Sequence, residues 1–162
     1  MKELIIIRHA KSSWDSGVES DFYRPLQQKG IIRAFETFNE LAKKLKRPDS
    51  VISSPAIRAY STACIFCSSF DIDLKSIQLE GKFYESSVSE ILSVISNQKN
   101  TVNSLVIIGH NYDFSFLVNE LSETQINYLK TAAYVCLSFK IEEWKDILKT
   151  KGKMTFYNHV EF

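Results

Sequence analysis

Runs of consecutive aliphatic residues alternate along this chain with stretches in which apolar residues recur every three or four positions. The predicted strands are residues 4–7, 49–53, 77–79, 102–108, 132–141 and 153–160. Residues 4–7 and 102–108 are rich in Ile, Val and Leu and lack polar alternation. Such runs are typical of strands that are buried on both faces of a parallel sheet.

Helical spacing fills the stretches between these strands. The predicted helices are residues 25–47, 54–68, 88–95 and 114–121. The first helix is opened by Pro25, and its apolar stripe is expected to face a sheet: Ile31, Ile32, Phe35, Phe38, Leu41, Ala42 and Leu45. Gly30 is unfavourable inside a helix, so its presence indicates a close approach to a neighbouring element. Ser54 followed by Pro55 predicts an N-cap and a first helical position for the second helix.

The alternation of strands and helices predicts the fold class. We expect an α/β fold, a three-layer α/β/α sandwich with a mostly parallel central sheet and an antiparallel strand at one side. Residues 142–152 are expected to join the last two strands as a hairpin, and the polar segment 11–24 is expected to be a long loop. With 162 residues and no repeat or linker, residues 1–162 are predicted to be a single domain.

Composition narrows the classes of function. The formal net charge is +1, so bulk charge gives no reason to expect a nucleic acid or a membrane as a partner. No signal peptide or apolar stretch of membrane-spanning length is visible, and we expect a cytoplasmic protein. Cys64, Cys67 and Cys136 lack the spacing of a disulfide framework. Cys64 and Cys67 fall in mid-helix and are predicted to be core residues, not a redox or zinc motif.

Three predicted strands end on groups that are poorly suited to burial without a partner. The first strand runs into Arg8 and His9, and the fourth runs into His110 and Asn111. The second strand leads to Arg58 one helical turn later. Carboxyl ends of parallel strands lie at one edge of a sheet, where ligands bind in open α/β folds. Two Arg and two His side chains there predict an anion site, because a guanidinium group binds phosphate oxygens in pairs.

The order and spacing of these residues resemble the histidine phosphatase superfamily, and within it the SixA-type phosphohistidine phosphatases most closely. The segments that carry the resemblance are residues 4–10, with the RHA box, 21–30, 53–63, 83–85 and 107–111, with GHN. Two positions depart from the family pattern. Tyr112 stands where the family has proline after GHN, and Ser61 stands where it has glutamine.

The resemblance implies a phosphatase that uses no metal and no cofactor. His9 would attack phosphorus and form a phosphohistidine intermediate, which water then hydrolyses. Arg8, Arg58 and His110 would hold the phosphoryl oxygens and stabilise the charge during transfer. Arg24 would bind the same phosphate from its Arg-Pro-Leu segment. Cationic neighbours are expected to lower the pKa of His9, and an acceptor on its far ring nitrogen is expected to fix the tautomer.

Two further residues keep two interpretations each. Glu85 is either the proton donor to the leaving group or a structural carboxylate. Asn111 is either a substrate ligand or the N-cap of the helix that follows it. A metal site on His9, His110 and Asp113 is a weaker alternative, because the flanking Arg residues make a cation site unfavourable.

The substrate also has more than one interpretation. The chain is too short for the insertions that cover the site in larger members, so we expect an open, shallow site. Such a site suits a phosphorylated protein that carries phosphohistidine, whereas a small phosphorylated molecule is the alternative; inorganic phosphate is the product of both. A non-catalytic phosphate-binding module is a third interpretation, which the intact Arg and His set disfavours. His159 matches no motif and is predicted to lie at the surface or at a sheet edge.

Overall fold

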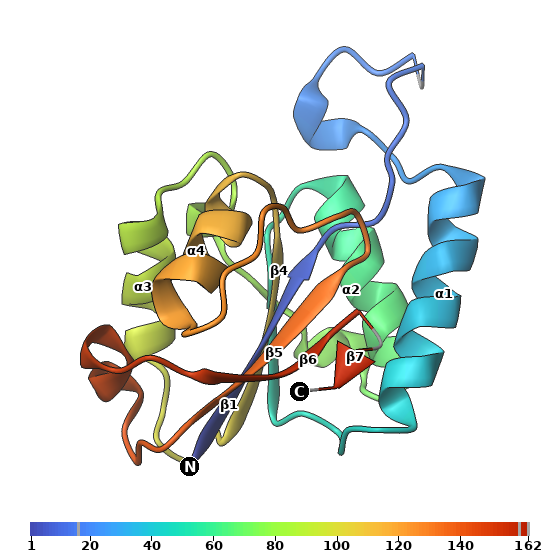
Figure 1. The fold of residues 1–162 in the computed structure, drawn as a ribbon. Helices are drawn as coiled ribbons and strands as arrows, with labels where there is room; N and C mark the ends of the chain where they lie inside the picture. The colour runs from blue at the N-terminus through green and yellow to red at the C-terminus, as the bar shows by residue number, and fades with distance from the viewer. Residues whose placement is uncertain (16, 159, 162) are drawn as a thin grey trace.

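The fold is built on one seven-stranded sheet within residues 1–15, 17–158 and 160–161, the part of the chain that the computed structural model describes (Figure 1). The strands are β1 (Lys2–Arg8), β2 (Ser50–Ser53), β3 (Gln78–Leu79), β4 (Ser104–Gly109), β5 (Tyr134–Phe139), β6 (Lys153–Tyr157) and β7 (Val160–Glu161). The spatial order is β3-β2-β4-β1-β5-β6-β7. His159, which was predicted to lie at the surface or an edge, is outside the described residues.

Strand direction divides the sheet into two parts. Strands β3, β2, β4 and β1 are parallel neighbours, whereas β5, β6 and β7 continue the sheet in antiparallel pairing. The predicted fold class is confirmed, with an antiparallel part that is wider than the one strand expected. The predicted hairpin is present, since β5 and β6 pair antiparallel, but its connection is not a plain loop, because Trp144–Lys149 folds as a 3-10 helix. Burial of Trp144, whose indole N–H donates to the Val102 carbonyl at 2.8 Å, explains the difference.

Helices cover both faces of the sheet, as Figure 1 shows. They are α1 (Gln28–Ala42), α2 (Ile57–Ser69), α3 (Val88–Ser96) and α4 (Asp113–Leu121). Alternate residues of β1 belong to opposite cores, since Ile5 and Ile7 pack with α1 and α2, whereas Leu4 and Ile6 pack with α3 and α4. Residues 4–7 are therefore buried on both sides, which accounts for the absence of polar alternation.

Helix α1 is shorter than predicted, and its buried stripe is narrower. It begins at Gln28, not at Pro25, and ends at Ala42. Its apolar contact with the sheet comes from Ala34, Phe38 and Leu41, which follow one face of the helix. The prediction that Ile32 and Phe35 share this face is wrong, because their side chains are 51% and 39% exposed on the outer side. The predicted stripe was too wide because it included residues on the ground that they are apolar, whichever face of the helix they lie on.

Gly30 has the role that the sequence predicted. A Cβ atom at this position would lie 2.5 Å from the backbone carbonyl oxygen of Lys11, so only glycine lets α1 approach this segment. The same carbonyl accepts a hydrogen bond from the Gln27 backbone N–H at 2.8 Å. The first turn of α1 is thereby fixed against the chain immediately after His9.

Helix α2 begins later than predicted. Its first residue is Ile57 and its N-cap position is Ala56, so the prediction that Ser54 is the N-cap is wrong. The Ser54 hydroxyl is within hydrogen-bond distance of a site histidine, as described below. Cys64 and Cys67 lie in the middle of α2 as free cysteines; Cys67 is buried as expected, whereas Cys64 is only partly buried. Among the described residues, no helix has the length and apolar character needed to cross a membrane.

Candidate active site

Three neighbouring parallel strands bring the site together. Strands β2, β4 and β1 lie side by side, and each is followed at its carboxyl end by a polar residue: Ser54, His110 and His9. The His9 backbone N–H donates to the Gly109 carbonyl at 3.0 Å, and the Ser54 backbone N–H donates to the Ile108 carbonyl at 2.9 Å. Arg58 joins them from the first turn of α2. The predicted convergence at one sheet edge is therefore present.

A cavity of about 340 Å³ opens at this edge. It is lined by Arg8, His9, Lys11, Ser12, Trp14, Arg24, Gln27, Arg58, His110, Asn111 and Thr131. Four of these side chains are Lys or Arg, and no Asp or Glu is among the described residues that line it. Its chemistry fits an anion.

His9 is held in one tautomer by the backbone. Its Nδ1 lies 2.7 Å from the carbonyl oxygen of Ala10, which only accepts, so Nδ1 carries the proton and donates. The Ala10 N–H in turn donates to the Thr62 hydroxyl at 2.9 Å, and that hydroxyl donates to the Arg58 carbonyl. The tautomer leaves Nε2 of His9 with a free lone pair, as a nucleophile requires.

Both site histidines are neutral at physiological pH. Burial, followed by the charges of Arg58, Arg8 and Arg24, lowers the pKa of His9 to about 3, against the opposing effect of the Ala10 hydrogen bond. Burial, followed by the neighbouring His9 and Arg58, lowers the pKa of His110 to about 3. The two ring centroids are 5.1 Å apart. The expected lowering of the His9 pKa is confirmed, although burial contributes more than the cations.

Asp21 supplies the counter-charge beside the cavity. It lies in the 3-10 helix η1 (Asp21–Tyr23), inside the loop after β1. Its carboxylate accepts hydrogen bonds of 2.9 Å from Arg24 Nε, Arg58 Nη2 and the Tyr84 hydroxyl. Burial opposes ionisation, but the hydrogen bonds from Tyr84 and Arg24 and the charge of Arg58 outweigh it and lower the pKa of Asp21 to about 2. Asp21 is thus an orienting carboxylate that holds no proton to donate near neutral pH.

Neighbouring protein groups also anchor the guanidinium groups of Arg24 and Arg8. Arg24 donates from Nη1 to the Ser12 hydroxyl at 2.7 Å, and its guanidinium stacks 3.6 Å from the Trp14 ring centroid. Arg8 donates from Nη1 to the Tyr128 hydroxyl and to the Leu129 carbonyl. These contacts fix the planes of both guanidinium groups.

Unpaired buried polar atoms mark the same place. Among the described residues, buried side-chain nitrogen or oxygen atoms without a partner are Arg8 Nε, Arg58 Nε and His110 Nδ1. Buried polar groups are otherwise almost always hydrogen-bonded in folded proteins. All three belong to residues that line one cavity, and all three were predicted as phosphate ligands. His110 Nε2 is occupied by the Ser54 hydroxyl at 2.8 Å, which leaves Nδ1 as its unpaired nitrogen.

Two predicted site residues are differently placed. Asn111 lines the cavity, but its amide donates to the Leu129 carbonyl at 2.8 Å and accepts from the Ser115 hydroxyl at 2.8 Å. The prediction that Asn111 is the N-cap is wrong, since Tyr112 holds that position without a side-chain cap. Glu85 is exposed and is not among the residues that line the cavity. Its placement favours the structural interpretation over the proton donor.

Four residues next to the site were not assigned from the sequence: Trp14, Asp21, Tyr84 and Tyr128. Asp21 and Tyr84 lie within segments that resembled the family, yet nothing local indicated that η1 folds back onto α2. Trp14 lines the cavity and stacks on the Arg24 guanidinium, a contact that sequence spacing does not indicate. Among the described residues, no group of three His, Cys, Asp or Glu side chains forms a candidate metal site.

Comparison with known proteins agrees with this geometry. A sequence profile of the histidine phosphatase superfamily (branch 1) matches residues 4–91, which is more than half of the chain. The chain belongs to the histidine phosphatase superfamily. It is therefore a hydrolase of the phosphatase type, and the matched segment contains His9, Arg24 and Arg58.

Similar proteins include several SixA structures. The structure assigned as phosphohistidine phosphatase SixA from Agrobacterium tumefaciens is 26% identical, with a TM-score of 0.76 over 85% of this chain and 91% of that chain. The protein histidine phosphatase SixA complexed with tungstate shares the fold, with a TM-score of 0.82, 20% identity and 96% of both chains covered. An uncharacterised chloroplastic protein of Arabidopsis thaliana is 26% identical over 159 residues, covering 93% of this chain and 72% of that protein.

The lowered pKa values predict that neither site histidine titrates near its ordinary value. In imidazole-detected NMR of the free protein, the His9 and His110 rings should keep neutral shifts from pH 8 to pH 5. Unfolded histidines bind protons near pH 6.5, and the folded protein does not. The free energy of unfolding should therefore fall as pH decreases from about 6.5 towards 3. Midpoints near pH 6.5 for both rings in the folded protein would contradict the assignment.

Proposed function

We propose that this histidine phosphatase removes phosphoryl groups from phosphohistidine on protein substrates, with His9 as the nucleophile and without a metal ion. The observation that supports it most is the set of groups around His9. Arg8, Arg58 and His110 each contribute a buried polar atom without a partner, and the cavity carries no acidic side chain among its described residues. The likeness to a SixA structure that holds tungstate, an oxyanion, is consistent with such a site.

The first step transfers the phosphoryl group to the enzyme. The Nε2 lone pair of His9 forms a bond to phosphorus while the bond between phosphorus and the substrate nitrogen breaks. A substrate imidazole that is protonated on its other nitrogen leaves as a neutral ring, with the electron pair of the broken bond. Arg8 and Arg58 stabilise the charge on the phosphoryl oxygens, and His110 hydrogen-bonds to the same group.

The second step hydrolyses phospho-His9. A water oxygen bonds to phosphorus as the bond to Nε2 breaks, inorganic phosphate forms, and the water proton passes to solvent. Nδ1 of His9 is kept protonated by the Ala10 carbonyl, so His9 leaves as a neutral imidazole. The two steps are then chemically equivalent, and neither needs a general acid.

The lack of a side chain that can protonate the leaving group favours some phosphatase substrates over others. An alkyl phosphate releases a strongly basic alkoxide, which needs a proton donor in the transition state. Asp21 cannot supply the proton, because its pKa is about 2, and Glu85 is exposed outside the cavity. A phosphohistidine avoids this requirement. The residues present thus favour phosphoramidates over alkyl esters.

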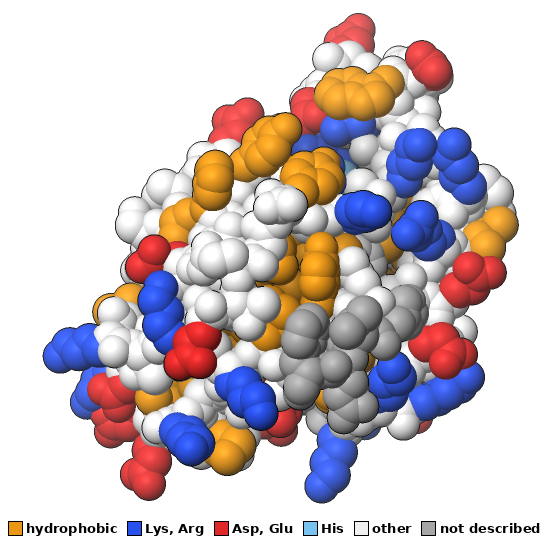
Figure 2. Space-filling model, in the orientation of Figure 1, with side chains coloured by type: hydrophobic (Ala, Val, Ile, Leu, Met, Phe, Trp, Pro, Cys, Tyr) orange, Lys and Arg blue, Asp and Glu red, His pale blue; other side chains and the backbone are white. Residues whose placement is uncertain are grey.

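An exposed aromatic row supports a protein as the carrier of the phosphohistidine. Phe116, Tyr112 and Tyr128 are 59%, 65% and 40% exposed, and neighbouring rings in the row are 6.5 Å and 6.0 Å apart. The row ends at the site, since the Tyr128 hydroxyl accepts a hydrogen bond from Arg8. Figure 2 shows hydrophobic side chains gathered on this face of the molecule. Exposed aromatic residues are typical of the centres of protein interfaces.

The mechanism predicts a steep dependence of rate on the leaving group. In the presence of EDTA, kcat/KM should be high for a phosphohistidine peptide and for para-nitrophenyl phosphate, and at least about 100-fold lower for an alkyl phosphate, by the usual magnitude of general acid catalysis. His9→Ala should abolish turnover of all three substrates. Equal rates for aryl and alkyl phosphates, or loss of activity in EDTA, would contradict the proposal.

Substitution of Arg58 should lower kcat strongly, whereas substitution of Glu85 should leave kcat almost unchanged. Arg58→Ala should lower kcat for para-nitrophenyl phosphate by about 100-fold or more, the usual cost of one lost transition-state donor. Glu85→Gln should change kcat by less than about twofold, since its side chain lies outside the cavity. Urea unfolding curves would show that both variants fold. A loss in Glu85→Gln as large as that in Arg58→Ala would restore Glu85 as the acid.

A phosphatase for small molecules is the alternative for the same chemistry. The two functions differ in whether the aromatic row contributes to binding. Tyr112→Ala should raise KM for a phosphohistidine protein and leave KM for para-nitrophenyl phosphate unchanged. A small metabolite that is preferred over phosphohistidine proteins by orders of magnitude in kcat/KM would favour the alternative.

A further inference from the structure

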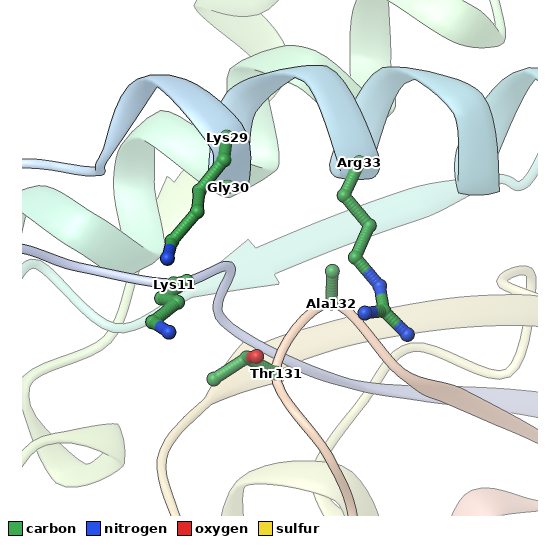
Figure 3. Close-up of a pocket in the computed structure, with 6 residues that line it drawn as sticks. All are labelled: Lys11, Lys29, Gly30, Arg33, Thr131 and Ala132. Atoms are coloured by element: carbon green, nitrogen blue, oxygen red, sulfur yellow. The ribbon is translucent and has the colours of Figure 1, made fainter.

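A second pocket lies beside the cavity that His9 lines, which we call the phosphate cavity. We call it the basic pocket; its volume is about 290 Å³, and its lining is Lys11, Lys29, Gly30, Arg33, Thr131 and Ala132 (Figure 3). Lys11 and Thr131 also line the phosphate cavity. One molecule could therefore occupy both hollows at once.

The basic pocket gathers positive charge that no described residue neutralises. In Figure 3, the side chains of Lys29 and Arg33 extend from α1 towards the segments that carry Lys11 and Thr131. No salt bridge joins these three cations to a carboxylate of the described residues. Contact with Lys29 lowers the pKa of Lys11, because neighbouring ammonium groups repel each other. Figure 2 shows Lys and Arg side chains gathered on this face over the N-terminal end of α1.

Two features of the backbone hold the cations together in spite of this repulsion. Gly30 lets the first turn of α1 lie against the Lys11 carbonyl, where any side chain would collide. The Gln27 N–H donates to the same carbonyl at 2.8 Å. Lys11 is two residues after His9, so these contacts also fix the basic pocket relative to the nucleophile. Like charges held by rigid backbone contacts beside a phosphate cavity fit the binding of a second anion.

We propose that the basic pocket binds a second anionic group of the substrate whose phosphoryl group lies against His9. On a protein substrate, this group is a carboxylate of an acidic segment next to the phosphohistidine. A second phosphate on a small molecule carries the same chemistry, and the experiment separates the two sources. The inference rests on the proposed function, since it assigns the specificity of that same site.

The test uses substrates that differ only in the second charge. One pair is a phosphohistidine peptide with Glu or with Gln beside the phosphohistidine. Another pair is an aryl bisphosphate and the matching aryl monophosphate. The wild-type protein should prefer the Glu peptide by about tenfold in kcat/KM, mainly through KM, and the preference should weaken as salt is added.

The double variant K29Q/R33Q removes charges that line the basic pocket and not the phosphate cavity. It should erase the preference for the second charge and leave para-nitrophenyl phosphate turnover within twofold of wild type. The matched control is K46Q/R47Q, which removes the same charge beyond the C-terminal end of α1 and should keep the preference.

The outcomes distinguish failure of the proposal for the basic pocket from failure of the proposed phosphatase function. Preference for the Glu peptide that K29Q/R33Q erases supports a protein substrate, and preference confined to the aryl bisphosphate supports a small one. Normal para-nitrophenyl phosphate turnover with no preference in either pair overturns the basic pocket alone, as does a preference that survives in K29Q/R33Q. Failure to turn over any of the substrates would instead contradict the proposed function.

Discussion

The fold must hold several Arg and His side chains close together although their positive charges would repel one another. Two strand ends and the first turn of α2 bring Arg8, Arg58 and two imidazoles to one sheet edge. Protonated imidazoles would add to this charge, and burial and the arginines together keep both rings neutral. Asp21 balances part of the remaining charge from outside the cavity. Arg8, Arg58 and His110, which each carry a buried polar atom without a partner, line the cavity at this edge, where an anion can balance their charge.

This balance connects the packing of the fold to its chemistry. The Thr62 hydroxyl accepts from the Ala10 N–H and donates to the Arg58 carbonyl, so the segment that follows β1 is hydrogen-bonded to α2. The Ala10 carbonyl fixes the tautomer of His9. In the proposed mechanism, this tautomer makes the ring a neutral nucleophile in the first step and a neutral leaving group in the second. Because that mechanism needs no proton donor, a cavity without an acidic side chain among its described residues suits a substrate whose own leaving group is an imidazole.

The sequence predicted the sheet edge well and the loop above it poorly. The composition of residues 4–7, all aliphatic, indicates a strand that is buried on both faces. Because the carboxyl ends of parallel strands lie at one edge of a sheet, the convergence of His9, Arg58 and His110 could be inferred. The roles of Asp21 and Ser54 could not, since both depend on contacts distant in sequence. The prediction that Phe35 is buried was wrong for a related reason, because an apolar side chain alone does not show which face of a helix packs against the sheet.

The central claim is that His9 carries the phosphoryl group during turnover. Rapid quenching of the enzyme with ³²P-labelled substrate, followed by peptide mapping at alkaline pH, measures this directly. We predict an acid-labile, base-stable phosphate on His9 that forms and decays as fast as turnover and is absent from His9→Ala. Turnover without any phosphoenzyme, or label on a residue other than His9, would contradict the account.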